Sequence, residues 1–264
     1  MVAASSSHGW LFGAVVPRLS LIVIARNEEA LIGRCLSSAA WVDEIVVVDN
    51  GSTDKTVEIA RAHGAKVIEA PDWPGYGPQK NRALDAATGE WVLSLDADEW
   101  IELPLAAAIR AAVADPAAAD GYEMPRRSRF CGRVVRHCGW WPDHVLRLFR
   151  RDRGRFSDNK VHERVVVAGR VARLDQPIEH DAIADLADAR DKASRYAAAA
   201  AAELAEEGQR SSAAKALLRA GAAFLRTYVL RAGFLDGKTG MRVALYNTDY
   251  TYQKYICLAK IKGA

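Results

Sequence analysis

Two hydrophobic periodicities alternate along the first hundred residues of this chain, and this alternation restricts the fold more than any other feature. Segments 19–24, 45–48 and 91–95 are nearly continuous apolar runs, the pattern of strands covered on both faces in a parallel sheet. Between them, residues 28–40 and 79–87 carry apolar side chains at helical spacing. Strands that alternate with helices predict an α/β fold with an open, mostly parallel sheet.

The remainder of the chain has a different character. Short strands are predicted over 121–130, 145–150 and 163–167, which indicates a short antiparallel extension of the sheet. From about residue 182 the pattern becomes helical and rich in alanine. We therefore expect three parts: an N-terminal extension over 1–17, an α/β domain over 18–180 and a helical region over 181–264.

The composition excludes several classes of protein. Hydrophobic residues make up 50% of the 264 residues, too many for an intrinsically disordered chain. The four cysteines show neither metal-ligand spacing nor the density of a disulfide scaffold, which favours a reducing compartment. The N-terminal residues lack the cationic start of a secretory signal, and no run reaches the roughly 18 apolar residues of a spanning helix. We expect a cytoplasmic protein.

The formal net charge of the chain is only +3, but the charged residues are distributed unevenly along it. Residues 1–125 carry 9 basic and 18 acidic side chains. Residues 126–155 carry 10 arginines against 2 aspartates, and residues 208–264 carry 10 basic against 2 acidic side chains. Two concentrated basic segments in a nearly neutral chain predict anionic partners at two places.

The strongest local motif is a pair of carboxylates, Asp96 and Asp98, separated by Ala97 at the end of an apolar run. Open α/β sheets bind their ligands at the carboxyl ends of the strands. Oxygen ligands suit Mg²⁺ or Mn²⁺, which would bridge the carboxylates to a diphosphate. The alternative interpretation is a solvated turn that caps a helix.

Two other predicted strands end in polar residues at the same edge of the sheet. Aspartate and asparagine there can bind a nucleobase or ribose through paired hydrogen bonds, and a glycine permits a tight turn. Turn and cap chemistry alone would also explain these residues. The candidates are Ala25, Arg26, Asn27 and Glu28 after the first strand, and Asp49, Asn50 and Gly51 after the second.

Together these segments resemble the family 2 inverting glycosyltransferases, which have a GT-A nucleotide-sugar-binding fold. The resemblance covers roughly residues 18–170 and is carried by four ordered motifs, I-V-I-A-R-N-E-E, V-V-V-D-N-G-S-T-D-K-T, Q-K-N-R-A-L and L-S-L-D-A-D-E. Further along, G-W-W-P-D-H-V-L-R-L-F and V-H-E resemble a narrower bacterial group. That group includes the lipopolysaccharide core β-1,4-glucosyltransferases, which act on inner-core heptose.

The resemblance implies roles for the strand-end residues. Residues 25–28 would line a uridine pocket, with Asp49 facing the base. Lys80 would lie near the diphosphate, and Asp96 would approach the ribose or the metal. Asp98 would ligate the metal directly, and His162 resembles a histidine that some members use as a further metal ligand. A structural loop histidine is the alternative for His162.

An inverting transfer needs a general base for the acceptor hydroxyl and electrophilic help for the departing diphosphate. Asp143 is the candidate base, since Trp140 and Trp141 beside it could stack on a sugar; Glu163 is the substitute candidate. The alternative for Asp143 is a structural role, either in a turn after the proline or in an ion pair with Arg147. Arg147 is also a candidate for binding the acceptor.

The basic segments fit a membrane-anchored acceptor. Arginines in 126–155 would bind acceptor phosphates, and no recognised nucleic-acid-binding module occurs, so we expect no nucleic acid partner. Helices over 208–264 combine aromatic, aliphatic and basic residues, as interfacial helices on anionic bilayers do. Packing on the catalytic domain or in a homo-oligomer would use the same apolar residues.

The sequence therefore predicts a metal-dependent inverting glycosyltransferase on the inner face of the bacterial cytoplasmic membrane. Its donor would be a UDP-sugar, with glucose preferred, and its acceptor the lipopolysaccharide inner core. A transferase acting on polyprenyl-phosphate or another surface glycan is one alternative. A non-catalytic scaffold that binds nucleotide sugars at the membrane is the other.

Overall fold

The computed structural model describes residues 18–157 and 164–261. The strands are β1 (Leu19–Ala25), β2 (Glu44–Asp49), β3 (Lys66–Glu69), β4 (Trp91–Asp96), β5 (Glu99–Ile101), β6 (Gly121–Phe130), β7 (Arg133–Val134), β8 (Asp143–Arg150), β9 (Gly154–Phe156), β10 (Val165–Val167), β11 (Val171–Arg173) and β12 (Ile178–Ile183). The helices are α1 (Ile32–Ser38), α2 (Thr56–Ala62), α3 (Tyr76–Ala86), α4 (Leu103–Ala114), α5 (Leu186–Glu206), α6 (Ala213–Leu225) and α7 (Gly237–Lys260). A π-helical turn η1 (Arg226–Leu230) and a 3₁₀ turn η2 (Gly233–Asp236) join α6 to α7.

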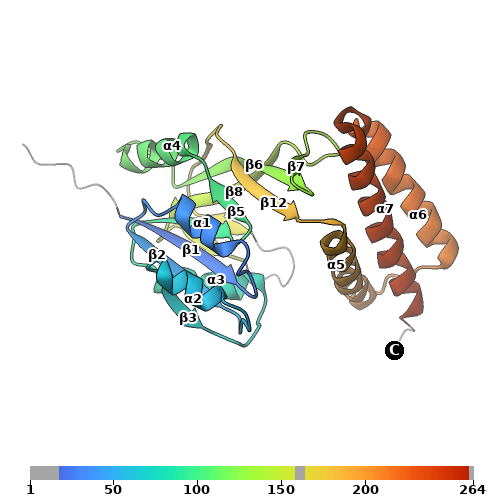
Figure 1. Cartoon of the computed structure of the whole chain (residues 1–264), viewed down its shortest axis with the longest axis horizontal. Coiled ribbons are helices and arrows are strands. Elements are labelled where there is room, and N and C mark those ends of the chain that lie inside the picture. The colour runs from blue at the N-terminus through green and yellow to red at the C-terminus, as the bar shows by residue number, and fades with distance from the viewer. Residues whose placement is uncertain (1–17, 158–163, 262–264) are drawn as a thin grey trace, which may run out of the picture.

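Most of the strands form one mixed sheet of ten strands, with the order β3-β2-β1-β4-β8-β6-β12-β5 and with β7 and β11 beside β6. Strands β3, β2, β1 and β4 run parallel to one another, and β8 pairs antiparallel with both β4 and β6. The C-terminal helices follow the sheet in the chain and lie to one side of it (Figure 1). The predicted α/β class, with an antiparallel extension and C-terminal helices, is confirmed.

Strand β1 shows why the sequence forms a sheet covered on both faces. Successive side chains of a strand point to opposite faces, so both must be apolar when both are buried. Leu21 and Val23 pack with α1, α2 and α4 on one face, whereas Ile22 packs with α3 on the other. The result is a three-layered α/β lobe in which the parallel strands end together at one edge.

The antiparallel half contains strands that the periodicity did not predict. The clearest is β12, Ile178–Ile183, which pairs with β6 and β5 where we expected a helix to begin near residue 182. Polar His180 and Asp181 interrupt its apolar pattern, so pairing with distant strands rather than local sequence fixes it. Helix α5 begins only after Asp185, whose carboxylate accepts hydrogen bonds from the backbone amides of residues 187 and 188.

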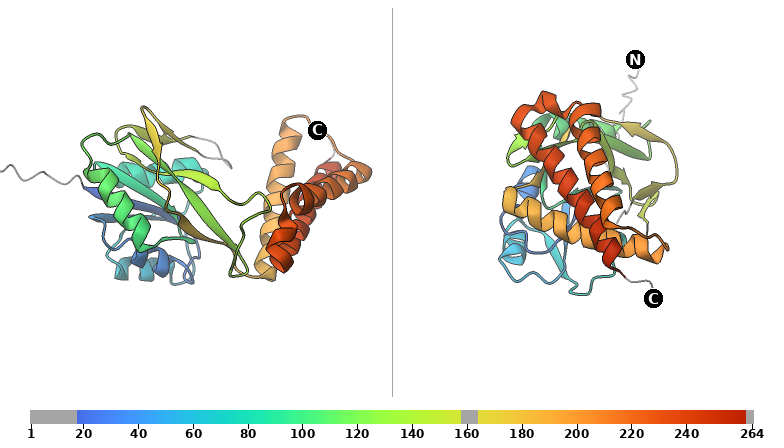
Figure 2. Two further views of the ribbon diagram at one scale, coloured as in Figure 1. Left: turned by 90° about the horizontal axis from the view of Figure 1, so that it is seen from above. Right: turned by 90° about the vertical axis from the view of Figure 1, so that its right-hand side faces the viewer.

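The helical region has small cores of its own. Helix α5 buries alanines four residues apart, which lets it pack against α7. Ala216 of α6 packs with Ala201, Tyr255 and Leu258. Figure 2 shows α6 and α7 on the outer side of this region, away from the sheet. No helix in the two described ranges is both long and apolar enough to cross a membrane.

A loop from the sheet is clamped to the helical region. The carboxylate of Asp236 accepts hydrogen bonds from the backbone amides of Arg136 (3.1 Å) and His137 (2.8 Å), and it lies 2.9 Å from Nδ1 of His137. The backbone amide of Cys138 donates to the carbonyl of Arg231 at 3.0 Å. The segment that leads to Trp140 is thereby fixed by the turn between α6 and α7.

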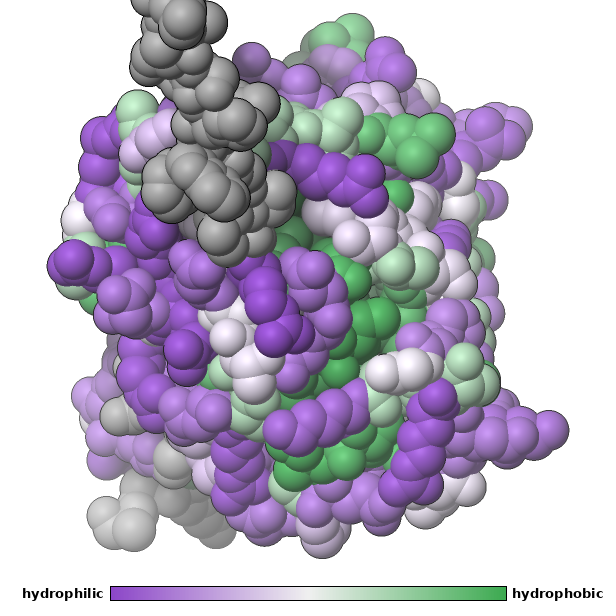
Figure 3. Space-filling model, turned by 90° about the vertical axis from the view of Figure 1, so that its left-hand side faces the viewer, coloured by the Kyte–Doolittle hydropathy of each residue, from purple (hydrophilic) through white to green (hydrophobic). Residues whose placement is uncertain are grey.

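The opposite end of the molecule has a different surface. Figure 3 shows the end of the α/β lobe far from α6 and α7, where hydrophilic residues cover most of the surface around a strip of apolar atoms. Large exposed apolar side chains are instead frequent from residue 217 onward.

Candidate functional site

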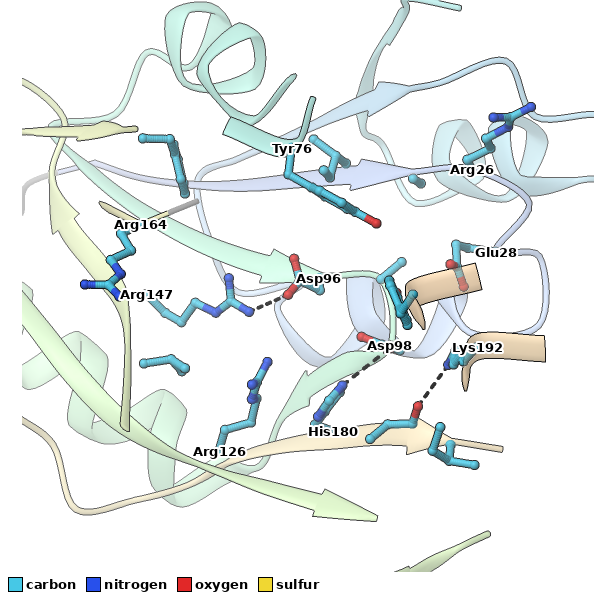
Figure 4. A pocket seen from close by; sticks show the side chains of 18 of the residues that line it. Arg26, Glu28, Tyr76, Asp96, Asp98, Arg126, Arg147, Arg164, His180 and Lys192 are labelled. Carbon is cyan, nitrogen blue, oxygen red and sulfur yellow. Dashed lines mark hydrogen bonds and ion pairs between the residues drawn. The ribbon is translucent and has the colours of Figure 1, made fainter. Parts of the chain in front are cut away.

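A cleft of about 1200 Å³ opens at the carboxyl ends of β1 and β4, between the α/β lobe and the helical region (Figure 4). Its walls come from strand ends, from β6, β8 and β12, and from helices α5 and α7. Parallel strands end together at one edge of a sheet, so residues distant in sequence meet there. The charged residues that line it are Arg26, Glu28, Asp96, Asp98, Glu123, Arg126, Arg147, Arg164, Lys192 and Arg195.

The two polar loops after β1 and β2 hold each other in place. Asn27 has a positive φ of 56°, and its side-chain oxygen accepts a hydrogen bond from the amide of Thr53 at 2.8 Å. Buried Asp49 accepts from the amides of Gly51 and Ser52, both at 2.9 Å. Gly51 itself has a φ of 78°, a conformation that favours glycine.

The candidate nucleotide-binding residues thus divide into two groups. Ala25, Arg26, Glu28 and Asn50 line the cleft, together with Asp96, Ala97 and Asp98. Asn27, Asp49 and Gly51 are outside the cleft lining and shape the loops beneath it. Lys80 is buried below the cleft and reaches it through its ion pair with Asp96.

Asp96 is held by two cations. Lys80 Nζ lies 2.8 Å from its Oδ1, and Arg147 Nη2 contacts its Oδ2. Burial alone would raise the pKa of Asp96, but the adjacent Arg147 and Lys80 hold it well below its usual value. The same Arg147 nitrogen lies 2.7 Å from Glu99 Oε1, whose side chain is fully buried. Arg147, a candidate for acceptor binding, is thus largely buried beneath Asp96.

Asp98 has a different environment. Its Oδ2 lies 3.4 Å from His180 Nε2, and both residues line the cleft. The other ring nitrogen of His180 lies 2.9 Å from the hydroxyl of Ser128. The carboxylate suits Mg²⁺ or Mn²⁺, which commonly take their remaining ligands from water and phosphate.

A complete metal site of protein ligands is not present within residues 18–157 and 164–261: no three His, Cys, Asp or Glu side chains there are grouped to hold an ion. Both oxygens of Asp96 already face cations. His162, the predicted third ligand, lies outside the described residues. His180 was missed by sequence reasoning because it lies in β12, which carries no strong sequence signal, and only pairing with β6 brings it to the site.

The acceptor-side candidates differ in their position relative to the cleft, and Asp143 is not among the residues that line it. Trp140 lines it, whereas Trp141 does not and is 37% exposed. Asp143 Oδ2 lies 2.6 Å from Nη2 of Arg126, a residue of the lining, so its partner is Arg126 rather than Arg147. Glu163, the substitute base, lies outside the described residues.

Helices α5 and α7 complete the cleft with residues that sequence reasoning did not identify. Lys192, Arg195 and Tyr196 come from α5, and Tyr246 comes from α7. Burial, together with Asp98, raises the pKa of Glu28 to about 7. Lys192 favours the charged form of Glu28 and thereby opposes this shift.

Similarity to known proteins extends over most of the chain. The family model described as "Glycosyl transferase family 2" matches residues 20–166. The chain is similar to the lipopolysaccharide core biosynthesis glycosyltransferase LpsC of Rhizobium meliloti (strain 1021), with 29% identity over 93% of this chain and 97% of the relative. It is 49% identical over 83 residues to an uncharacterized glycosyltransferase of Rickettsia typhi, which covers 31% of this chain and 28% of that protein.

Solved structures match more loosely. Residues 1–349 of TarS from S. aureus match with a TM-score of 0.45 and 20% identity over 88% of this chain and 80% of that one. Glucosyl-3-phosphoglycerate synthase from Mycobacterium tuberculosis, crystallised with Mn²⁺, UDP and glucosyl-3-phosphoglycerate, matches with a TM-score of 0.36 and 30% identity. That second match covers 43% of this chain and 44% of the synthase.

Proposed function

Because this chain belongs to glycosyl transferase family 2, we propose that it transfers a hexose, with inversion, from a UDP-sugar to a saccharide acceptor. The observation that carries the proposal is the convergence, in one cleft, of carboxylates from the ends of β1 and β4 with cations from β6, β8 and α5. A nucleoside diphosphate needs such a mixture, because cations must meet its phosphates while polar groups bind its base and ribose. Glucose is the preferred hexose.

The donor would occupy the strand-end side of the cleft. Ala25, Arg26, Glu28 and Asn50 would surround the uridine, and Asp96 would face the ribose. Asp96 is suited to this role because Lys80 and Arg147 keep it ionised and fixed in position. Asp49 and Asn27 would act through the loops that they hold.

Asp98 and His180 would hold a divalent cation, Mg²⁺ or Mn²⁺, together with the donor phosphates. When bound, this cation would neutralise charge on the departing UDP. Lys192, which also lines the cleft, would add positive charge around the diphosphate.

Asp143 is the proposed general base. It would take the proton of the acceptor hydroxyl while that oxygen forms a bond to the anomeric carbon and the bond to UDP breaks. Arg126, which lies between Asp143 and Glu99, would fix the carboxylate at the edge of the cleft. Trp140 would stack on the acceptor sugar.

The proposed acceptor is a membrane-anchored glycan, with the lipopolysaccharide inner core preferred. The relative from Rhizobium meliloti, which the chain matches along nearly its whole length, is named for lipopolysaccharide core biosynthesis. Exposed arginines near the cleft suit a phosphorylated saccharide. The α/β lobe would carry out the transfer at the inner face of the cytoplasmic membrane, with the helical region in contact with that membrane.

The test is UDP release from a panel of UDP-sugars with purified acceptor glycolipid, with and without Mn²⁺. Asp143→Asn should keep donor binding and lose about 10²–10⁴-fold in turnover. Asp98→Asn should lose the dependence on metal together with activity. Asp85→Asn, which alters an exposed ion pair on α3, is the matched control and should behave as the wild type.

Two results would reject these roles. Full metal-dependent activity in Asp98→Asn would remove Asp98 from the cation site. Loss of donor binding in Asp143→Asn, rather than loss of turnover alone, would assign Asp143 to the donor pocket.

A further inference from the structure

The turn that clamps the Trp140 loop also carries an unusual surface. Seven large apolar side chains are exposed along α6, η1 and η2, and together they are called the docking face: Leu217, Leu218, Leu225, Val229, Leu230, Phe234 and Leu235. Leu218 is 76% exposed, Leu230 75% and Leu235 61%. A helix at the surface of a globular protein normally presents polar residues to water. Exposed apolar side chains gathered on neighbouring elements in this way indicate a surface that binds a partner.

The docking face is not the packing face of α6. Small residues, Ala216, Ala220 and Ala223, form the buried side of that helix, so leucines are not needed there for its contact with α7. Leu218 and Leu225 of α6 are seven residues apart and therefore lie on one side of that helix. In Figure 1, α6 lies beyond α7 as seen from the sheet, so this edge is on the outside of the molecule.

The charged residues within the segment that forms the docking face are basic except for Asp236. Arg219, Arg226, Arg231 and Lys238 are all exposed and alternate with its apolar residues. Between residues 213 and 238 the one acidic residue is Asp236, which is bonded to the loop at residues 136 and 137. Apolar side chains flanked by arginine and lysine match the chemistry of an anionic bilayer, where acyl chains lie beneath phosphate groups.

We propose that the docking face inserts into the surface of an anionic lipid bilayer. A second copy of this chain is a poorer fit, because self-association through this edge would bring its arginines face to face. Each inserted leucine or phenylalanine gains from leaving water, and each flanking cation gains from the lipid phosphates.

This inference rests on the proposed function and makes it more specific, because the docking face and the acceptor side of the cleft share one turn. Asp236 ends η2 and holds the loop that leads to Trp140. A lipid-linked saccharide in the same bilayer would therefore be presented beside the wall of the cleft that Trp140 lines.

Vesicle sedimentation of the full chain tests the proposal. Phosphatidylcholine vesicles with and without about 30% phosphatidylglycerol serve as probes, and binding should require the anionic lipid. The triple variant Leu225→Ser, Leu230→Ser and Phe234→Ser should reduce the partition coefficient by about tenfold or more. A control with Leu103→Ser and Val166→Ser, exposed apolar residues of the α/β lobe, should bind as the wild type does.

Sedimentation velocity and turnover of a lipid-free acceptor fragment separate the outcomes. Undiminished vesicle binding by the triple variant, or no binding by the wild type, would overturn the proposal. A dimer that dissociates in the triple variant would do the same, by making the face an interface between copies. Failure of the proposed glycosyl transfer would appear instead as absent turnover on the fragment, with vesicle binding intact.

Discussion

Arg147 offers the sharpest test of how this cleft is held together. One of its nitrogens contacts both Asp96 and Glu99, and its side chain is only 9% exposed. Replacement by methionine keeps much of the length and apolar volume of the side chain but removes the charge. We predict that Arg147→Met destabilises the fold and raises the pKa of Asp96, because Lys80 alone then opposes the effect of burial.

The magnitude follows from what the variant leaves behind. Glu99 is fully buried, and after loss of Arg147 its remaining cation is Arg126 at 3.4 Å, compared with 2.7 Å for Arg147. Removal of one partner from a buried ion pair costs about 3–5 kcal/mol, since the other charge stays out of water. The remaining contact with Arg126 places the expected loss near the lower end, about 3 kcal/mol.

Urea unfolding followed by circular dichroism measures this effect. With an m-value of about 3 kcal/mol per molar, the midpoint should fall by about 1 M. Arg61→Met is the matched control, because Arg61 and Glu69 form an exposed ion pair whose loss should cost about 0–1 kcal/mol. A midpoint for Arg147→Met equal to that of the control would refute the buried network as a source of stability.

The pH dependence supplies a second check. The pKa of Asp96 is lower in the folded protein than in the unfolded chain. Its ionised carboxylate therefore stabilises the fold at pH values above the unfolded-state pKa, and this stabilisation is lost as the pH falls towards the folded-state pKa. In Arg147→Met the contribution is smaller. The difference between wild type and variant should therefore narrow below the ordinary aspartate pKa of 3.8. A difference that stays constant down to the acid transition would contradict the assignment to Asp96.

Three further predictions concern the cleft, its clamp and the packing of the helical region. Folding raises the pKa of Glu28 from 4.5 to about 7, so ionisation of this carboxyl destabilises the folded protein as the pH rises from 4.5 to 7. Glu28→Gln should therefore be as stable as the wild type at pH 4 and more stable at pH 8. Unfolding measured at both pH values in the presence of EDTA checks this. Asp236→Ala removes the clamp on the Trp140 loop and should cost about 2 kcal/mol while raising the KM for acceptor more than that for donor. Gly240→Ala would place a methyl group 1.8 Å from the backbone carbonyl oxygen of Gly233, and it should lower the free energy of unfolding by about 3 kcal/mol. In Gly221→Ala the added methyl group on α6 meets no atom within 4 Å, so the free energy of unfolding should rise by about 0.5–1 kcal/mol. Thermal unfolding measures both changes.

The parallel half of the sheet could be predicted because its signal is local. A strand buried on both faces must be apolar at every position, so β1, β2 and β4 are visible as continuous runs. The polar residues that end these strands could be placed at one edge by the same reasoning. Asp96, Asp98, Glu28 and Asn50 do meet in one cleft.

The partners of those residues could not be predicted, because they are chosen by packing between distant segments. Arg147 faces Asp96 because β8 pairs with β4, and His180 faces Asp98 because β12 is placed beside β6 and β5. The contribution of α5 to the cleft has the same origin, since nothing in an alanine-rich amphipathic helix indicates which surface it will cover.

The sequence by itself therefore determined the α/β class, the strand ends that form the edge of the cleft and the basic, apolar character of the C-terminal helices. The tertiary structure decided which charges neutralise one another, which helix closes the cleft and that the leucines of α6 face outward. The physical reason is the distance along the chain over which each feature is set. Hydrophobic periodicity is a pattern of neighbouring residues, whereas an ion pair or a packed face depends on distant segments that only the folded backbone brings together.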